Sequence, residues 1–469
     1  MTRYLISGFP SPEIKLLSGP VAEEFLIMSV HVARATIHCA GEIWTPYRNG
    51  ASVRLSTYKS AAMLVDDHGV ISEIGESAEI FKKHPSAKRI DHGSAIIIPG
   101  FVDGHLHCPQ LDVIGSGGYR LLDWLDQYVF PAEAAFKDAD VARRGARRLT
   151  RELVRHGITT AAAFSSVHAH AADLLFDSFD RSGLRLVAGK TSMDIGAPKD
   201  VLEPVAQDIE SQENLIAKWH GRDGRLFYAI TPRFALSCSP AMMKALQALR
   251  EKHGSCYVQT HISENINEVN DVLAVWKGFR DYLAVYEDHG LLGSKTLLAH
   301  GIYLTESELT RVAASGTSIV HCPTSNTFLG SGLFNLNRAT TAGAKVCLAS
   351  DIGAGTGLSP WQTMLECYKV QALQGASVSA DELLYRATLA GAEALSLDVK
   401  TGSLEVGKYA DFVVVRPDKN ELLGERLAVT KSSSERLFAC IAYGDDRIVD
   451  SVYVAGKRLN DSVAWNDLA

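Results

Sequence analysis

The stretch Pro99-Gly100-Phe101-Val102-Asp103-Gly104-His105-Leu106-His107-Cys108-Pro109-Gln110 decides the fold prediction. It follows the apolar run Ala95-Ile96-Ile97-Ile98, which is rich in β-branched residues and typical of a buried strand. Side chains alternate between the two faces of a strand, so His105 and His107 share a face. Two imidazoles at the end of a buried strand are half of the ligands that a metal site needs. The other ligands would have to come from the ends of other strands.

Length, composition and charge limit the class of protein. The chain has 469 residues, enough for one large domain with additions or for about two to three average domains. A hydrophobic content of 46% with 22% charged residues is typical of a globular protein with a substantial core. The net charge is −7 and no Lys/Arg-rich block appears, so nucleic-acid binding is disfavoured and a small ligand is favoured.

Cysteine usage and the N-terminus indicate a cytoplasmic protein. The eight cysteines form no Cys-x-x-Cys pair, and several lie in apolar runs, so we expect reduced, buried side chains. No apolar stretch approaches the about 20 residues that span a bilayer, so we expect no membrane partner. Residues 1–27 lack the pattern of a secretory signal and predict an irregular leader, with Met28 as an alternative start.

Short alternating runs at both ends of the chain predict a small β domain. They lie at 30–38, 52–58, 62–65, 70–74, 411–415 and 448–456. We expect residues 1–98 and 403–469 to form one β-sandwich, with residues 99–402 inserted between them as a separate domain.

The inserted segment has the length and pattern of a (β/α)₈ TIM barrel, an α/β fold. It contains roughly 300 residues, and such a barrel needs about 250. Eight strand candidates, separated by helical or turn-rich segments, lie at 101–107, 158–164, 184–189, 226–231, 256–261, 296–300, 317–321 and 345–351. Near-continuous apolar runs separated by helices are typical of a parallel sheet that is covered on both faces.

Polar residues end several of these runs, at the face where such barrels carry their active sites. They are His105 and His107 on the first strand, His261 on the fifth, His300 on the sixth and Asp351 on the eighth. Packing explains this pattern poorly, because each buried polar side chain would need its own partner. Nitrogen and carboxylate ligands without thiolate suit Zn²⁺ or Fe²⁺ with a position open for water. Glu264, three residues after His261, is the candidate proton carrier beside that water.

These residues resemble the amidohydrolase superfamily, and the resemblance extends over nearly the whole chain. It includes the Pro-Gly-Phe-Val-Asp-Gly-His-Leu-His stretch, the strand-end His and Asp residues and the split β domain. More specific stretches resemble the guanine deaminases within that superfamily. They lie at 107–110, 122–133, 231–234, 260–265, 299–301 and 321–326.

The resemblance implies a role for each of these side chains. One Zn²⁺ per chain, or Fe²⁺ in its place, would be held by His105, His107, His261 and Asp351. His300 would orient water and substrate, and Asp351 would accept the proton of the water. Glu264 would carry a proton to a purine ring nitrogen. Gln110, Arg233 and Phe234 would hold the base. The implied reaction is hydrolytic deamination of guanine to xanthine and ammonia, by a cytoplasmic homodimer.

Other residues refine this prediction. The fourth strand ends in Thr231-Pro232-Arg233-Phe234 without the lysine that bridges two metals in some amidohydrolases, so one metal is expected. Lys190 is expected to form a salt bridge, and His321 to support the site or the fold. Gly115 to Gly118 and residues 121–130 are expected to cover the site, with Trp124 and Phe130 packing rather than contacting the ligand.

Two alternatives stay open at this point. The enzyme could deaminate or dechlorinate another heteroaromatic ring, such as a triazine, a pterin or an oxidised purine. The chain could instead be an inactive amidohydrolase-like scaffold. Scaffold relatives usually lose metal ligands, whereas all of them are present here.

Overall fold

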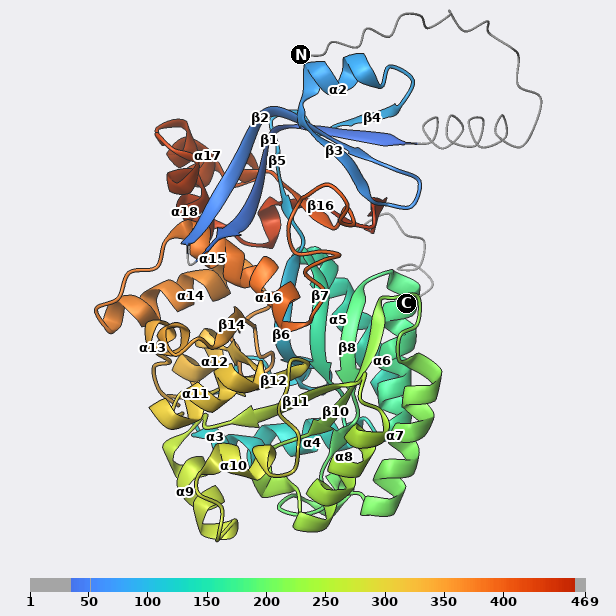
Figure 1. Ribbon diagram of the computed structural model, residues 1–469, viewed down its shortest axis with the longest axis vertical. Coiled ribbons are helices and arrows are strands. Elements are labelled where there is room, and N and C mark those ends of the chain that lie inside the picture. The colour runs from blue at the N-terminus through green and yellow to red at the C-terminus, as the bar shows by residue number, and fades with distance from the viewer. Residues whose placement is uncertain (1–34, 51, 460–469) are drawn as a thin grey trace, which may run out of the picture.

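Two sheets organise the chain, of which the computed structural model describes residues 35–50 and 52–459. Figure 1 shows the first sheet above the second, and we call them the terminal sheet and the barrel. The terminal sheet consists of β1 (Thr36–Asn49), β2 (Ser52–Val65), β3 (Ile71–Glu76), β4 (Lys88–Asp91), β5 (Ile96–Pro99), β15 (Phe412–Val415), β16 (Val449–Val454) and β17 (Lys457–Arg458). Their order is β17-β16-β15-β5-β1-β2-β3, with β4 paired to β1. Both ends of the chain therefore build one small β domain.

One difference from the sequence prediction lies in β2. The runs at 52–58 and 62–65 are a single strand, which pairs with β1 on both sides of Ser60. Ser60 has a φ of 45°, so the side-chain alternation is interrupted there while the pairing continues beyond it. That local irregularity is why the sequence pattern indicated two strands.

The barrel consists of parallel strands in the order β14-β13-β12-β11-β10-β8-β7-β6, with the short β9 paired to β10. They are β6 (Phe101–His107), β7 (Ile158–Phe164), β8 (Arg185–Gly189), β9 (Thr191–Ser192), β10 (Leu226–Pro232), β11 (Tyr257–Ile262), β12 (Thr296–His300), β13 (Ser318–His321) and β14 (Lys345–Leu348). Backbone hydrogen bonds join the two ends of this series: the His107 N–H donates to Ile352 O (2.7 Å) and the Asp351 N–H to His105 O (2.9 Å). The first and last strands are thus tied together where the candidate ligands lie.

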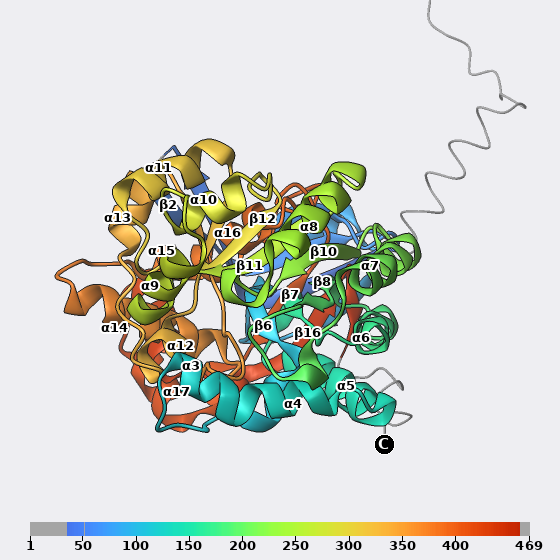
Figure 2. The same ribbon diagram turned by 90° about the horizontal axis from the view of Figure 1, so that it is seen from below.

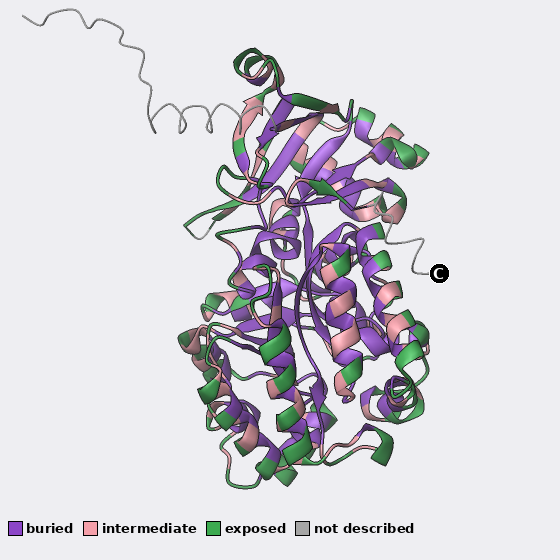
Figure 3. Ribbon diagram, turned by 90° about the vertical axis from the view of Figure 1, so that its right-hand side faces the viewer, coloured by how far each residue is buried: buried purple, intermediate pink, exposed green. Residues whose placement is uncertain are grey.

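Helices surround the barrel, and the longer ones bury one face against it and expose the other, as Figure 3 shows by its buried strands and exposed outer helix faces. They are α5 (Ala139–Arg155), α6 (Ala169–Ser182), α7 (Val205–Trp219), α8 (Pro240–Lys252), α9 (Ile266–Val275), α10 (Tyr282–Glu287), α11 (Glu306–Ser315), α12 (Pro323–Phe328), α13 (Leu336–Thr341), α14 (Pro360–Leu373), α15 (Ala380–Ala387) and α16 (Leu389–Ala394). In α5 the buried Ala142, Ala146, Leu149 and Leu153 are three or four residues apart and form one apolar stripe.

The remaining helices lie at the two ends of the barrel. The terminal sheet carries α2 (Ser77–Lys83), α17 (Glu421–Ala428) and α18 (Ser433–Tyr443). The helices α3 (Leu121–Trp124) and α4 (Phe130–Ala135) follow β6. Figure 2 views the barrel from the end that faces away from the terminal sheet, and α3 and α4 lie along one side of it.

A buried ion pair joins the barrel to the C-terminal segment. Arg185 on β8 donates from Nε and Nη2 to the Asp411 carboxylate (2.6 and 3.1 Å), and both side chains are buried. The Thr401 hydroxyl and the Ala455 N–H also donate to this carboxylate (2.9 and 2.8 Å). Asp411 therefore connects three segments that lie far apart in the sequence.

The predicted fold class, a (β/α)₈ barrel with a small β-sandwich domain built from both termini, is confirmed in the barrel and in the two-ended β domain, whose strands form one hydrogen-bonded sheet. The domain boundaries at 98/99 and 402/403 stay a prediction. The leader at 1–27 and Met28 lie outside the described residues. Within the described part of the chain, no helix has the length and apolar character needed to cross a bilayer.

Candidate active site

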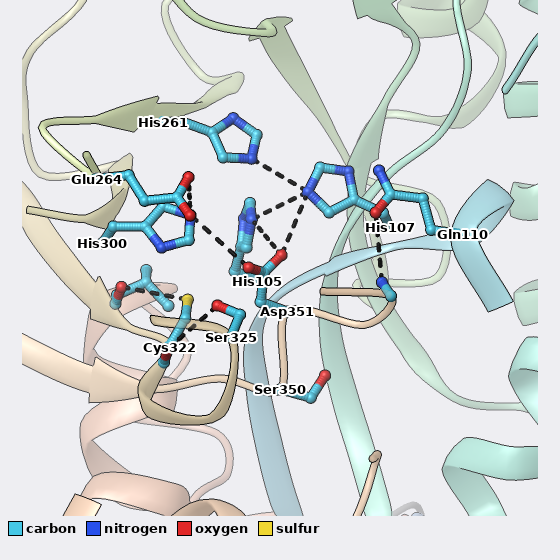
Figure 4. Close-up of polar contacts among 12 residues, drawn as sticks. His105, His107, Gln110, His261, Glu264, His300, Cys322, Ser325, Ser350 and Asp351 are labelled. Carbon is cyan, nitrogen blue, oxygen red and sulfur yellow. Dashed lines mark hydrogen bonds and ion pairs between the residues drawn. The ribbon is translucent and has the colours of Figure 1, made fainter. Parts of the chain in front are cut away.

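Side chains from four strand ends meet at the mouth of the barrel (Figure 4). His105 and His107 come from β6, His261 from β11 and His300 from the last position of β12. Asp351 follows β14 by three residues. The carboxyl ends of parallel strands lie at one edge, so the strand-end pattern of the sequence becomes one cluster in space.

Three imidazole nitrogens in this cluster lie close enough to share a metal ion, and a carboxylate oxygen lies beside two of them. His107 Nε2 lies 3.2 Å from His105 Nε2 and 3.1 Å from His261 Nε2. Asp351 Oδ1 lies 3.3 Å from His105 Nε2 and 3.5 Å from His107 Nε2. Ligands about 2.0–2.1 Å from a tetrahedral zinc ion are separated by about 3.3–3.4 Å. This geometry fits one divalent metal ion.

The protonation of these histidines also suits metal binding. His261 Nδ1 donates to the Arg233 carbonyl oxygen (2.6 Å), which leaves a lone pair on Nε2 toward the cluster. Burial, with further contributions from neighbouring imidazoles, lowers the pKa of His107 and His261 well below 6.5. Both rings are therefore neutral at pH 7, and neutral imidazole is the form that binds metals.

Asp351 is held as a carboxylate in a strained backbone position. Burial favours its protonated form, but the hydrogen bond with His105 and electrostatic attraction from His105 and His300 outweigh burial and lower the pKa of Asp351 below 3.8. Asp351 has a φ of 50° and His300 a φ of 71°, in a region that non-glycine residues rarely adopt. Such strain is typical of functional sites, where the surrounding structure fixes a side chain in one direction.

Glu264 has the properties of a proton carrier. The residue is 4% exposed, and burial is the main reason why its pKa rises from 4.5 to about 7. The Ser331 hydroxyl donates to Oε1 (3.3 Å), and Oε2 lies 3.4 Å from His300 Nε2. The Glu264 backbone N–H donates to Glu268 Oε2 (2.8 Å), which fixes the start of α9 beside the cluster. A carboxyl group with a pKa near 7 can both accept and donate a proton at neutral pH.

His300 differs electrostatically from the other three histidines. Its Nδ1 donates to Asn326 Oδ1 (2.9 Å), and its Nε2 faces the carboxylates of Glu264 and Asp351. Burial would lower its pKa, but these two carboxylates outweigh burial and raise it above 6.5. His105, His300 and Asp351 could also hold a metal ion by distance alone. A histidine that favours the protonated state is, however, better suited to donate a hydrogen bond than to bind a cation.

A pocket opens beside the cluster, and its lining combines apolar side chains with a few polar ones, as is typical of small-molecule sites. Gln110, Arg233 and Phe234 line one part of it. Leu121, Trp124 and Leu125 also line it, and they belong to the segment 121–130 that was expected to cover the site. The pocket therefore contains apolar side chains, the Arg233 cation and the Gln110 amide. These lie next to the histidines and carboxylates of the cluster.

Each residue singled out from the sequence can now be placed. Gln110, Arg233, Phe234, His107, His261, Glu264, His300 and Asp351 all line the pocket, and His105 lies against its floor. Lys190 forms buried ion pairs with Glu203 (2.5 Å) and Asp208, as predicted. His321 is buried and stacks on Phe334. Trp124 is buried in a packed apolar cluster and also lines the pocket. That it packs rather than contacts the ligand stays a prediction.

The sequence reasoning missed four residues that support these side chains. They are Glu133, Glu268, Asn326 and Ser331. Glu133 and Asn326 are the last residues of the stretches 122–133 and 321–326 that resemble the guanine deaminases, which is the only signal that could have indicated them.

Comparison with known proteins identifies the family. Residues 96–459 match the amidohydrolase family model. The chain belongs to the amidohydrolase family. A guanine deaminase of Escherichia coli strain K12 is 40% identical over 396 residues, which cover 84% of this chain and 90% of the relative. The predicted resemblance to guanine deaminases within the amidohydrolase family is therefore confirmed.

Solved structures of amidohydrolases agree with this grouping. The structure of E. coli guanine deaminase is 37% identical, has a TM-score of 0.86, and the match covers 91% of this chain and 99% of that one. A guanine deaminase from C. acetobutylicum, described with bound guanine in the active site, is 31% identical with a TM-score of 0.83. That match covers 91% of this chain and all of the other.

Proposed function

We propose that the protein is a guanine deaminase that hydrolyses guanine to xanthine and ammonia. One observation carries the proposal: the pocket joins the histidine and aspartate cluster and Glu264 to the polar pair of Arg233 and Gln110. The first part suits hydrolysis, and the second suits a flat base with polar edges. The relatives at 30–40% identity that are named guanine deaminases support this substrate.

The metal site would hold one Zn²⁺ per chain, with Fe²⁺ as the alternative. The ligands would be His105, His107, His261 and Asp351, because their atoms have the spacing and protonation described above. A divalent metal in this position supplies Lewis acidity, which activates water for addition to carbon at neutral pH.

The proton transfers would involve two carboxyl groups. Asp351, whose pKa is low, would hold and accept a proton of the attacking water. Glu264, with a pKa of about 7, would deliver a proton to the ring nitrogen next to C2. The ring can then accept electron density as water adds to C2. The proton held by Asp351 would pass to the amino group, which would then leave as ammonia. His300 would donate a hydrogen bond beside C2, since its neighbours favour its protonated form.

The base would be held by the polar pair in the pocket lining. Arg233 and Gln110 would contact the polar edges of guanine, and Phe234 would contact its ring. The apolar side chains of Leu121 and Trp124 would exclude water from the bound base.

The two other readings of the sequence have weaker support. Variants of a triazine hydrolase share the fold at 21% identity and a TM-score of 0.79, which shows the fold alone. An inactive scaffold would not require histidines and an aspartate that converge on one point, with Glu264 beside them as a proton carrier.

Incubation of the purified protein with guanine tests the proposal. We expect guanine to be converted to xanthine with release of one ammonia per base, and a triazine or pterin to react more slowly. His261→Ala is the control, since it removes one ligand. If another heteroaromatic compound is turned over faster than guanine, that compound and not guanine is the substrate. The absence of ammonia release from every ring in the presence of Zn²⁺ or Fe²⁺ would favour the scaffold.

We further propose that the protein works as a homodimer in the cytoplasm. The eight cysteines are free and buried, which suits a reducing compartment. Light scattering of the purified protein would report twice the mass of one chain if the dimer forms.

A further inference from the structure

Glu133 on α4 is a buried carboxylate that contacts two polar side chains of the pocket lining. Its side chain accepts two hydrogen bonds from Arg233 Nη1 (2.6 and 2.7 Å) and one from Gln110 Nε2 (3.0 Å). Glu133 is 0% exposed, and Arg233 and Gln110 are buried with it. A buried carboxylate is tolerated only when it is paired and hydrogen-bonded, so these three side chains form one unit.

The carboxylate fixes the orientation of the Gln110 amide. A carboxylate only accepts hydrogen bonds, so it turns the amide nitrogen of Gln110 toward itself. The Gly353 N–H lies 3.4 Å from Gln110 Oε1, which agrees with this orientation of the amide. One N–H of the amide remains for a ligand in the pocket.

The same carboxylate fixes the Arg233 guanidinium. Its oxygens bind Nη1, and the ring of Phe130 lies 5.5 Å from the guanidinium carbon. Held on these two sides, the planar group has its orientation set before any ligand arrives, and its other N–H groups remain as donors. The polar wall of the pocket is therefore a fixed pair of hydrogen-bond donors.

We propose that Glu133 is a positioning residue that makes the site selective for 2-amino-6-oxopurines over 2,6-diaminopurines. This inference rests on the proposed function, because it concerns the same reaction at C2. The oxygen at C6 of guanine accepts hydrogen bonds from the fixed N–H groups of Arg233 and Gln110. An amino group at C6 instead brings its own N–H donors against these N–H groups, and neither side finds an acceptor. Unpaired donors in a buried site discriminate strongly against the wrong substrate, provided that they cannot turn away.

Kinetics of Glu133→Gln on two purines test the inference. Guanine and 2,6-diaminopurine both carry an amino group at C2, and they differ at C6. For guanine we expect KM to rise by about ten-fold or more and kcat to change by less than about three-fold, the loss typical of a misplaced charged hydrogen bond. We expect the ratio of kcat/KM for guanine to that for 2,6-diaminopurine to fall by at least about ten-fold, with unchanged metal content.

Two further variants separate positioning from folding. Glu308→Gln changes another buried glutamate, at the N-terminal cap of α11, and should lower stability without changing the substrate ratio. Glu133→Asp keeps the charge but draws the oxygens back by one bond, and should lower the ratio less than Glu133→Gln. If Glu133→Gln does not fold, the ratio for Glu133→Asp decides the question.

The outcomes separate this inference from the proposed function. Wild-type protein that releases no ammonia from either purine overturns both. Active wild-type protein with a wild-type substrate ratio in Glu133→Gln, or in Glu133→Asp if only that variant folds, overturns the positioning role alone. An equal loss of kcat on both purines, with an unchanged ratio, also overturns it.

Discussion

Replacement of Glu264 by glutamine should abolish most activity and yet stabilise the metal-free protein at neutral pH. Burial raises the pKa of Glu264 from 4.5 in the unfolded chain to about 7 in the folded protein. Between these values the folded protein binds more protons than the unfolded chain, so its stability falls as the pH rises. A difference of about 2.5 pKa units corresponds to about 3 kcal/mol of lost stability above pH 7. Glutamine cannot ionise and does not lose this stability.

Urea denaturation at pH 5 and pH 8 measures the effect. A chelator is present in both series, because a cation near Glu264 would favour its ionised form. The free energy of unfolding of Glu264→Gln, relative to wild type, should increase by about 2.5 kcal/mol from pH 5 to pH 8, because part of the loss in wild type has already occurred at pH 5. Glu251→Gln on the exposed face of α8 is the matched control and should follow wild type at both pH values.

The same variant tests the role of Glu264 in catalysis. With metal restored, turnover of guanine should fall by about 10²–10⁴, the range of general acid–base catalysis, while metal content is unchanged. If the free energy of unfolding changes with pH in the same way in wild type and Glu264→Gln, the pKa of Glu264 is not raised. Wild-type turnover in the variant would remove Glu264 from the proton transfer.

Three more predictions concern the base, the domain contact and the metal. Arg233→Ala should raise KM for guanine by about 10–100-fold, and an unchanged KM in steady-state assays would place the base elsewhere. Asp411→Ala leaves Arg185 buried without its carboxylate. Urea titrations should show a free energy of unfolding that is lower by about 3–5 kcal/mol, with KM unchanged. A loss below about 1 kcal/mol would contradict a structural role for this ion pair. His261→Ala should bind less than one metal per chain by elemental analysis, and full occupancy would exclude His261 as a ligand.

The strand-end residues could be predicted because their positions follow from simple geometry. His105 and His107 share a face by the two-residue period of a strand, and parallel strands bring their carboxyl ends to one edge. The same period failed in β2, where Ser60 breaks the alternation without breaking the pairing with β1. Local pattern therefore predicted the cluster but not the extent of every strand.

The supporting residues could not be predicted from local pattern. Glu133 lies 100 positions from Arg233 and 23 from Gln110 in the sequence, and no periodicity relates them. Asn326 reaches His300 from α12, a helix that follows another strand. Such contacts depend on how helices pack over the barrel mouth, which only the three-dimensional structure shows.

Titration of zinc into chelator-treated protein, with turnover of guanine to xanthine followed at each addition, tests the central claim most directly. The account predicts that xanthine formation rises linearly with zinc and reaches its plateau at one equivalent per chain. Xanthine formation that does not depend on added metal, or guanine left unchanged at every zinc level, would contradict it.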